Sequence, residues 1–238
     1  METYQEFLDR IGAFEKKEVT FGDGYFRANP SLVPKVGPDN RFRPFFGDTV
    51  VFDLEEATKG EIAAIAETLH REAGECFCEK LAADTFHMTL HDLSNAPLLE
   101  TVAPEIADRQ QKVRSKAEKI GAQTIKMKTK AVFNMVNTSL VLGLYPANEE
   151  EYQKLMAMYM LFDDVKKLPY PFTPHITLAY YNPKGFAAAS AKKLERTVRK
   201  LNESDMEICL TTRRLFYQVF SSMNEFTNVL SLSASKED

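Results

Sequence analysis

The sequence predicts an α+β fold in two lobes, in which a duplicated unit forms two antiparallel sheets that face a central cleft, with helices on the outer faces. Three observations predict it: the tetrapeptide His-x-Thr-Leu occurs twice, a strand and a helix precede each copy, and the spacing is nearly the same in both. The chain advances 36 positions from Val51 to His87 and 34 positions from Val141 to His175. Such a repeat is typical of a duplicated half.

A helix and a long arm are expected before the first strand. Apolar residues recur at helical spacing over residues 4–14, which predicts an amphipathic helix. Residues 22–47 contain four prolines without a clear period, so we expect an extended arm. An arm that covers the core is the simpler interpretation. An arm over a cleft would instead bring cationic and aromatic side chains to a ligand, namely Arg41, Arg43, Phe45 and Phe46. We therefore divide the chain into an N-terminal helix and arm, residues 1–46, and a two-lobed domain, residues 47–238.

The repeated unit can be followed along the chain. A short apolar strand is expected at residues 48–52, a helix at 62–74 and the first motif strand at 86–90. A helix at 105–120 and a strand at 124–133 lead to the second unit. There a strand at 139–144 precedes a helix opened by Asn148 and Glu151, which are spaced as a capping box, and the second motif strand follows Pro174. A helix at 188–201, strands at 208–220 and 228–232, and a tail at 233–238 complete the chain.

The two motifs place polar side chains on one face of each strand. Successive strand residues point to opposite faces, so His87 shares a face with Thr89, and His175 shares one with Thr177. If the alternation continues, two further side chains join this face as candidates for substrate contact, His91 and Tyr181. The late strand offers cationic and aromatic candidates for the other side of the cleft, Arg213, Arg214 and Tyr217.

Two imidazoles and two hydroxyls around one volume suit phosphoryl transfer. One imidazole can take a proton from water or a hydroxyl while the other protonates the leaving oxygen, so His87 and His175 are the catalytic candidates. Thr89 and Thr177 can donate to the non-bridging phosphate oxygens. The scheme needs no metal, and no cofactor is expected. A zinc site of His87, His91 and His175 is a weaker interpretation, because a His-x-x-x-His spacing suits a helix and spreads the two rings apart on a strand.

The two motifs, His87-Met88-Thr89-Leu90 and His175-Ile176-Thr177-Leu178, resemble those of the two-histidine phosphoesterase superfamily. Its members include the LigT-like RNA 2′-5′ ligases, the plant and fungal cyclic phosphodiesterases and the nucleotide-binding domain of an A-kinase anchoring protein. The resemblance covers roughly residues 47–232 in the order of the elements and is sharp only at the motifs. It implies hydrolysis of a 2′,3′-cyclic phosphate or a 2′-5′ phosphodiester. Two alternatives stay open: a nucleotide sensor with little catalysis, and RNA end processing of the ligase kind.

Net charge and cysteine content limit the classes of partner and the compartment that we expect for this protein. The net charge of −4 argues against a protein that holds long nucleic acid, whose affinity comes mostly from Lys and Arg at phosphates, whereas a small nucleotide or an RNA end is compatible. Cys76 and Cys78 are too close together for a disulfide framework and Cys209 is alone, which favours free thiols in a reducing compartment. With neither a secretory signal nor a long apolar run in view, we expect a cytoplasmic protein without membrane association. The oligomeric state stays open.

Overall fold

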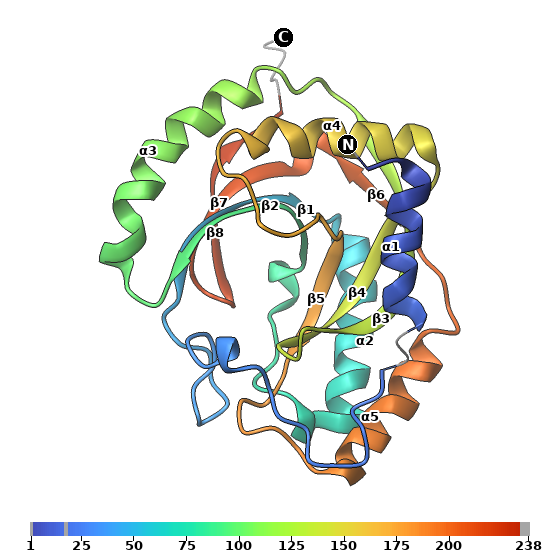
Figure 1. Ribbon diagram of the computed structural model, residues 1–238. Coiled ribbons are helices and arrows are strands. Elements are labelled where there is room, and N and C mark those ends of the chain that lie inside the picture. The colour runs from blue at the N-terminus through green and yellow to red at the C-terminus, as the bar shows by residue number, and fades with distance from the viewer. Residues whose placement is uncertain (1, 17–18, 234–238) are drawn as a thin grey trace.

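A curled antiparallel sheet organises the structure, a computed structural model (Figure 1). Within the residues that it describes, 2–16 and 19–233, eight strands pair in the order β6-β3-β4-β5-β2-β1-β7-β8. The bounds of the strands are β1 (Phe46–Asp53), β2 (His87–Ala96), β3 (Thr124–Met135), β4 (Ser139–Pro146), β5 (His175–Tyr180), β6 (Glu207–Thr211), β7 (Leu215–Ser222) and β8 (Glu225–Ser231). Residues 234–238 of the expected tail lie outside the described part.

Helices lie around the outside of this sheet (Figure 1). They are α1 (Tyr4–Lys16), α2 (Glu56–Ala73), α3 (Leu99–Ala117), α4 (Glu149–Asp163) and α5 (Ala188–Leu201), with short 3₁₀ turns η1 (Pro30–Leu32), η2 (Gly74–Cys76), η3 (Ala83–Thr85) and η4 (Thr212–Arg214). Helix α3 contacts β1 and β2, α4 contacts β3 and β4, and α2 contacts α5 and β5. In the described part of the chain, none of these helices is long and apolar enough to cross a membrane.

The expected α+β fold with a duplicated strand-helix-strand unit is confirmed. The units are β1-α2-β2 and β4-α4-β5, and in each of them the two strands are antiparallel neighbours. The halves β6-β3-β4-β5 and β2-β1-β7-β8 meet where β2 pairs with β5. The two sheets expected from the sequence are therefore the two halves of one continuous sheet, joined through the two motif strands.

Among the boundaries that differ from the sequence prediction, two change the arrangement of elements. The strand expected at 208–220 is broken by η4, so β6 pairs with β3 in one half while β7 pairs with β1 in the other. The buried side chain of Thr212 stabilises this break, because its hydroxyl accepts a hydrogen bond from the Gln123 amide (3.0 Å) and donates to the Gly121 carbonyl (3.1 Å). Helix α3 begins at Leu99 and so includes Pro104, which the sequence places before the helix.

At the start of α4 the expected cap is half realised. Asn148 accepts a hydrogen bond from the Glu151 amide (3.0 Å), as in a capping box. The Glu151 carboxylate instead accepts from the Lys126 amide of β3 (2.9 Å) and so connects the helix to the sheet. This hydrogen bond between Glu151 and Lys126 holds α4 on the half of the sheet that contains β5.

A hydrophobic cluster fills the space between the sheet and the helices and includes α1 and the arm. Phe7 of α1 and the arm residues Leu32 and Val36 are fully buried in it, so the arm does cover the core. Burying each such side chain stabilises the fold by about 1.5–3 kcal/mol. Strand β1 begins at Phe46, and the division of the chain at that point stays a prediction. Cys76 and Cys78 are buried free thiols, and burial raises the pKa of both to about 12.

Candidate functional site

The two His-x-Thr motifs meet at the centre of the sheet. Strands β2 and β5 run antiparallel with Met88 opposite Ile176, the middle residues of the two motifs. In this register His87 lies opposite Thr177, and His175 lies opposite Thr89. Met88 and Ile176 are fully buried on the core side, whereas the four polar side chains are half-buried on the other face. The chain thus brings together the two motifs that the sequence pairs only by repetition.

Both imidazoles are held by the same local hydrogen bond. His87 Nδ1 lies 2.7 Å from the Thr85 carbonyl oxygen, and His175 Nδ1 lies 2.7 Å from the Thr173 carbonyl oxygen. Since a carbonyl only accepts, each Nδ1–H is the donor, which leaves Nε2 of the neutral ring with its lone pair. Each ring therefore has one nitrogen held by the backbone and one that can exchange a proton with a ligand.

The protonation of the two rings is set by burial and by nearby carboxylates. Burial lowers the pKa of His87 and of His175, and the hydrogen bonds to the backbone carbonyls oppose it. The Asp92 carboxylate raises the pKa of both rings, and Asp53, opposite His87 on β1, also raises that of His87. Neutral rings are favoured at neutral pH, with a negative charge nearby that stabilises an imidazolium when it forms.

A β-bulge follows each motif and reverses the alternation of side chains. On β2, Thr89 and His91 pair with the consecutive β1 residues Val51 and Val50, so Leu90 is the extra residue. On β5, the extra residue is in the same position, because Thr177 and Ala179 pair with Val141 and Leu140. After each bulge, the next side chain on the face of the histidine and threonine comes one residue later than simple alternation predicts. On β2 this side chain is Asp92, and on β5 it is Tyr180.

The prediction that His91 lies on this face is contradicted. His91 is 1% exposed, and its ring stacks on Tyr159 of α4 with centroids 5.0 Å apart. Its Nδ1 donates to the Asp92 carbonyl (2.9 Å), and its Nε2 is 3.7 Å from the Asp163 carboxylate. The bulge at Leu90 turns the ring toward α4, so His91 does not converge with His87 and His175, as the zinc interpretation requires.

The prediction that Tyr181 faces a substrate is also contradicted. Tyr181 is fully buried, and its ring packs against Phe26 and Phe77 with centroid distances of 5.0 Å and 5.9 Å. Its hydroxyl has no hydrogen-bond partner among the described residues, and burial raises its pKa. Tyr180, which the alternation assigns to the core, is half-buried on the other face, where its hydroxyl donates to the Met223 sulfur (3.2 Å).

Sequence reasoning missed three polar side chains in this region, Asp92, Tyr180 and Lys35. The Lys35 ammonium extends from the arm and lies 5.3 Å from the ring centre of Phe45 and 5.9 Å from that of Tyr180. No carboxylate among the described residues forms an ion pair with it. Burial lowers the pKa of Lys35, and the charge of Asp92 opposes this shift. Comparing the two motifs beyond their leucines would have drawn attention to Asp92 and Tyr180, while no sequence signal distinguishes Lys35.

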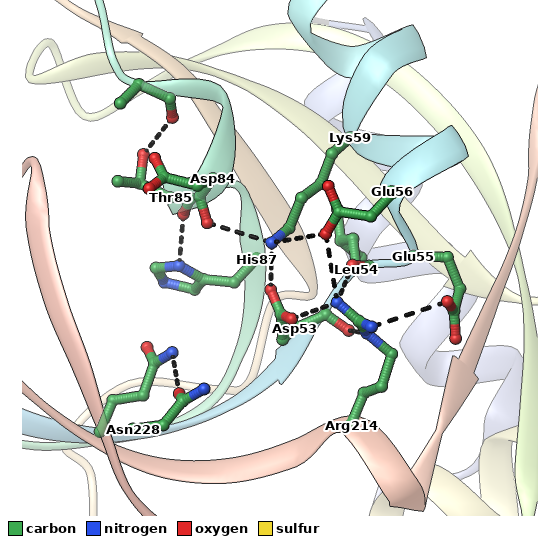
Figure 2. Close-up of polar contacts among 12 residues, drawn as sticks. Asp53, Leu54, Glu55, Glu56, Lys59, Asp84, Thr85, His87, Arg214 and Asn228 are labelled. Atoms are coloured by element: carbon green, nitrogen blue, oxygen red, sulfur yellow. Dashed lines mark hydrogen bonds and ion pairs between the residues drawn. The ribbon is translucent and has the colours of Figure 1, made fainter.

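The three candidates near the late strand, Arg213, Arg214 and Tyr217, lie in different environments. Tyr217 is fully buried and donates to the Asp48 carboxylate (3.0 Å). Arg214 pairs with Asp53, and Figure 2 shows this guanidinium facing the same carboxylate that Lys59 contacts at 2.7 Å. Arg213 is exposed. Of the three, only Arg214 is close to a histidine of the motifs, through Asp53.

Among the comparisons with known proteins, the search of solved structures finds a similar fold. No family model matches the sequence, and no curated protein matches it. Among solved structures, the conserved protein of unknown function ATU0111 from Agrobacterium tumefaciens str. C58 aligns with a TM-score of 0.63 and 17% identity, over 87% of this chain and 94% of that one. The α+β fold described above is therefore shared with a protein of very different sequence.

Two further solved structures align with lower scores. E. coli LigT complexed with 3′-AMP aligns with a TM-score of 0.47 and 14% identity, over 78% of this chain and 96% of that one. A structure described as a phosphoesterase aligns with a TM-score of 0.45 and 15% identity, over 79% of this chain and 96% of that one.

Proposed function

We propose that the protein is a metal-independent phosphodiesterase that hydrolyses a 2′,3′-cyclic phosphate or a 2′-5′ phosphodiester in a small nucleotide or at an RNA end. One observation carries the proposal: the pairing of Met88 with Ile176, which sets the two His-x-Thr pairs opposite one another on one face. The choice of bond comes from the resemblance of the two motifs. The net charge of −4 favours a small substrate over a long nucleic acid.

In this mechanism the two rings work as an acid and a base on opposite sides of one phosphorus. The Nε2 of one histidine takes a proton from water as its oxygen bonds to phosphorus. The bond from phosphorus to the ribose oxygen breaks, and the protonated second histidine gives its proton to that oxygen. Either histidine can serve as the base, because both carry the same Nδ1–H hydrogen bond to a backbone carbonyl.

The remaining groups stabilise the negative charge that builds on the non-bridging oxygens. Thr89 and Thr177 each stand opposite a histidine and can donate a hydroxyl hydrogen bond to these oxygens. Lys35 adds a positive charge beside Tyr180, and burial strengthens its attraction for an anion. Together they supply donors and a charge without a metal ion.

Replacing the histidines tests the proposal. His87→Ala and His175→Ala should each lower kcat by about 10²–10⁴-fold, the usual contribution of one acid-base group. Turnover of the four 2′,3′-cyclic nucleotides and of 2′-5′ dinucleotides is measured, and thermal unfolding checks that the variants fold. His70→Gln, on α2, is the matched control and should keep full turnover.

Undiminished turnover in either alanine variant would contradict the assignment. Absence of turnover in the natural chain, with mononucleotide binding retained, would favour the alternative of a nucleotide-binding module.

A further inference from the structure

A cavity of about 380 Å³ opens beside His87, between η3 and the hairpin of β7 and β8. Its size lies within the range of about 300–1,000 Å³ that is usual for small-molecule sites. His87 is part of its wall, so a phosphate held between the two histidines would have this cavity directly at its side. The proposed mechanism leaves the cavity without a role.

The charges in the wall disfavour a second phosphate. Lys59 lines the cavity, but its ammonium contacts the Asp53 carboxylate at 2.7 Å, the Asp84 carbonyl at 3.1 Å and the Glu56 carboxylate at 3.6 Å. Figure 2 shows these contacts converging on Lys59, with Arg214 also directed at Asp53. Since the cation is already neutralised and Asp84 and Glu225 add negative charge to the wall, an uncharged occupant fits better than an anion.

Two amide side chains in the same wall, Gln218 and Asn228, have hydrogen-bonding groups that a ligand could use. Gln218 is 7% exposed, and its Nε2 donates to Asn228 Oδ1 at 2.7 Å. Its Oε1 is buried and has no hydrogen-bond partner among the described residues. A buried acceptor left without a partner is unfavourable, so a ligand that donates a hydrogen bond to it would be stabilised in the cavity. The exposed Asn228 adds an amide donor beside this acceptor.

An aromatic ring completes the wall. Phe226 of β8 lines the cavity and meets the His87 ring edge-on, with centroids 4.9 Å apart. It is half-buried, so part of its surface is available to a planar ligand. A planar, uncharged ring with donors and acceptors along one edge is the chemistry of a nucleobase, which proteins bind by stacking on aromatic side chains and by hydrogen bonds to the base edge.

We propose that this cavity is the nucleobase subsite of the enzyme, with the Gln218–Asn228 pair reading the edge of the base and Phe226 contacting its face. The proposal rests on the function proposed above, because it takes the phosphate to lie at the histidines. It assigns base preference to the β7–β8 hairpin, which lies outside both motifs.

Calorimetric titration tests the subsite. The probes are the 3′-monophosphates of adenosine, cytidine, guanosine and uridine, with ribose 5-phosphate as the base-free probe. The natural chain should bind at least one nucleotide about tenfold or more tightly than ribose 5-phosphate, since base stacking contributes about 1–3 kcal/mol. Gln218→Leu and Asn228→Ala should each lower the ratio of nucleotide affinity to ribose 5-phosphate affinity by about tenfold. The affinity for ribose 5-phosphate itself should stay unchanged. Asn228 is exposed, so its variant keeps the test valid should Gln218→Leu fail to fold.

Ser231→Ala, at an exposed position of β8 outside the cavity wall, is the control and should bind as the natural chain does. Equal affinity of the natural chain for nucleotides and ribose 5-phosphate would overturn the subsite, as would an unchanged preference in Asn228→Ala. Turnover of cyclic nucleotides is measured in parallel. Turnover without base preference refutes the subsite alone, whereas base-dependent binding without turnover refutes the hydrolase and retains the subsite.

Discussion

The same contact holds both motif histidines, although different local structures provide it. On β2 the accepting carbonyl belongs to Thr85, the last residue of the 3₁₀ turn η3. On β5 it belongs to Thr173, which precedes Pro174 and is therefore biased toward an extended backbone. Two unlike segments thus place a carbonyl at the same distance from Nδ1 and fix the orientation of each ring, which the proposed acid-base catalysis requires.

The charge of Asp92 acts on both motif histidines. Its carboxylate raises the pKa of His87 and of His175, and it accepts a hydrogen bond from the Tyr170 hydroxyl (3.0 Å). In Asp92→Asn the imidazolium forms lose this attraction, so both pKa values should fall. The acidic limb of the pH profile of kcat/KM, where the base becomes protonated, should move to lower pH, and so should the alkaline limb, where the acid loses its proton.

The profile is measured for the natural chain, for Asp92→Asn and for Asp108→Asn, which removes an exposed carboxylate of α3. Only Asp92→Asn should move the limbs. A shift of either limb toward higher pH would show that Asp92 does not stabilise the charged rings.

Lys35 is the cation of the arm that takes part in the proposed mechanism. Lys35→Met keeps most of the side-chain volume and removes the charge, so kcat/KM should fall by about 10–100-fold, equivalent to the ~1.5–3 kcal/mol of a hydrogen bond to a charged group. Inorganic phosphate should also inhibit the variant less strongly. Lys112→Met, which removes an exposed charge on α3, is the matched control. Equal inhibition of Lys35→Met and the natural chain by phosphate would exclude Lys35 from the anion site.

At the level of elements, the strands could be predicted better than the direction of their side chains. Period-two alternation correctly separates His87 and Thr89 from Met88, because these residues precede the bulge. It fails at His91 and Tyr181, because an extra residue after Thr89 and after Thr177 reverses the side chains that directly follow, and an apolar leucine carries no mark of a bulge.

The contribution of the arm to the site could not be predicted for a different reason. The position of Lys35 depends on tertiary contacts: the buried side chains of Leu32 and Val36, and the hydrogen bond from the Arg43 amide to the Lys35 carbonyl (2.9 Å). No periodicity within the arm encodes them. The break at η4 is similar, since Thr212 is buried by partners about 90 positions away along the chain.

One buried carboxylate joins four elements of the first half. Asp48 of β1 is 1% exposed and accepts hydrogen bonds from the Ser94 amide of β2 (2.8 Å), Arg109 of α3 (2.9 Å) and the Tyr217 hydroxyl of β7 (3.0 Å). Asp48→Ala leaves the Arg109 charge and the tyrosine hydroxyl without their acceptor in a buried place. The free energy of unfolding should fall by about 3–5 kcal/mol, the usual cost of breaking a buried ion pair from one side.

Urea unfolding followed by circular dichroism measures this change. Asp108→Ala breaks an exposed pair with Lys112 on the same helix as Arg109 and should change stability by less than about 1 kcal/mol. A comparable effect of the two substitutions would mean that the Asp48 cluster does not stabilise the first half.

On the scale of the whole molecule, the proposed mechanism takes one acid-base group from each half of the sheet, so neither half alone would hold a complete site. The β2–β5 pairing joins the halves and sets Met88 opposite Ile176, which lies 88 positions further along the chain. Because the proposed reaction needs both imidazoles at once, their contributions to kcat should not be independent. In the double variant His87→Ala/His175→Ala, kcat should therefore lie within about tenfold of the slower single variant, as for residues that act as a unit. Single-turnover assays with a 2′,3′-cyclic nucleotide give the three rates, and losses that multiply to the full product of the two single effects would show two histidines acting separately.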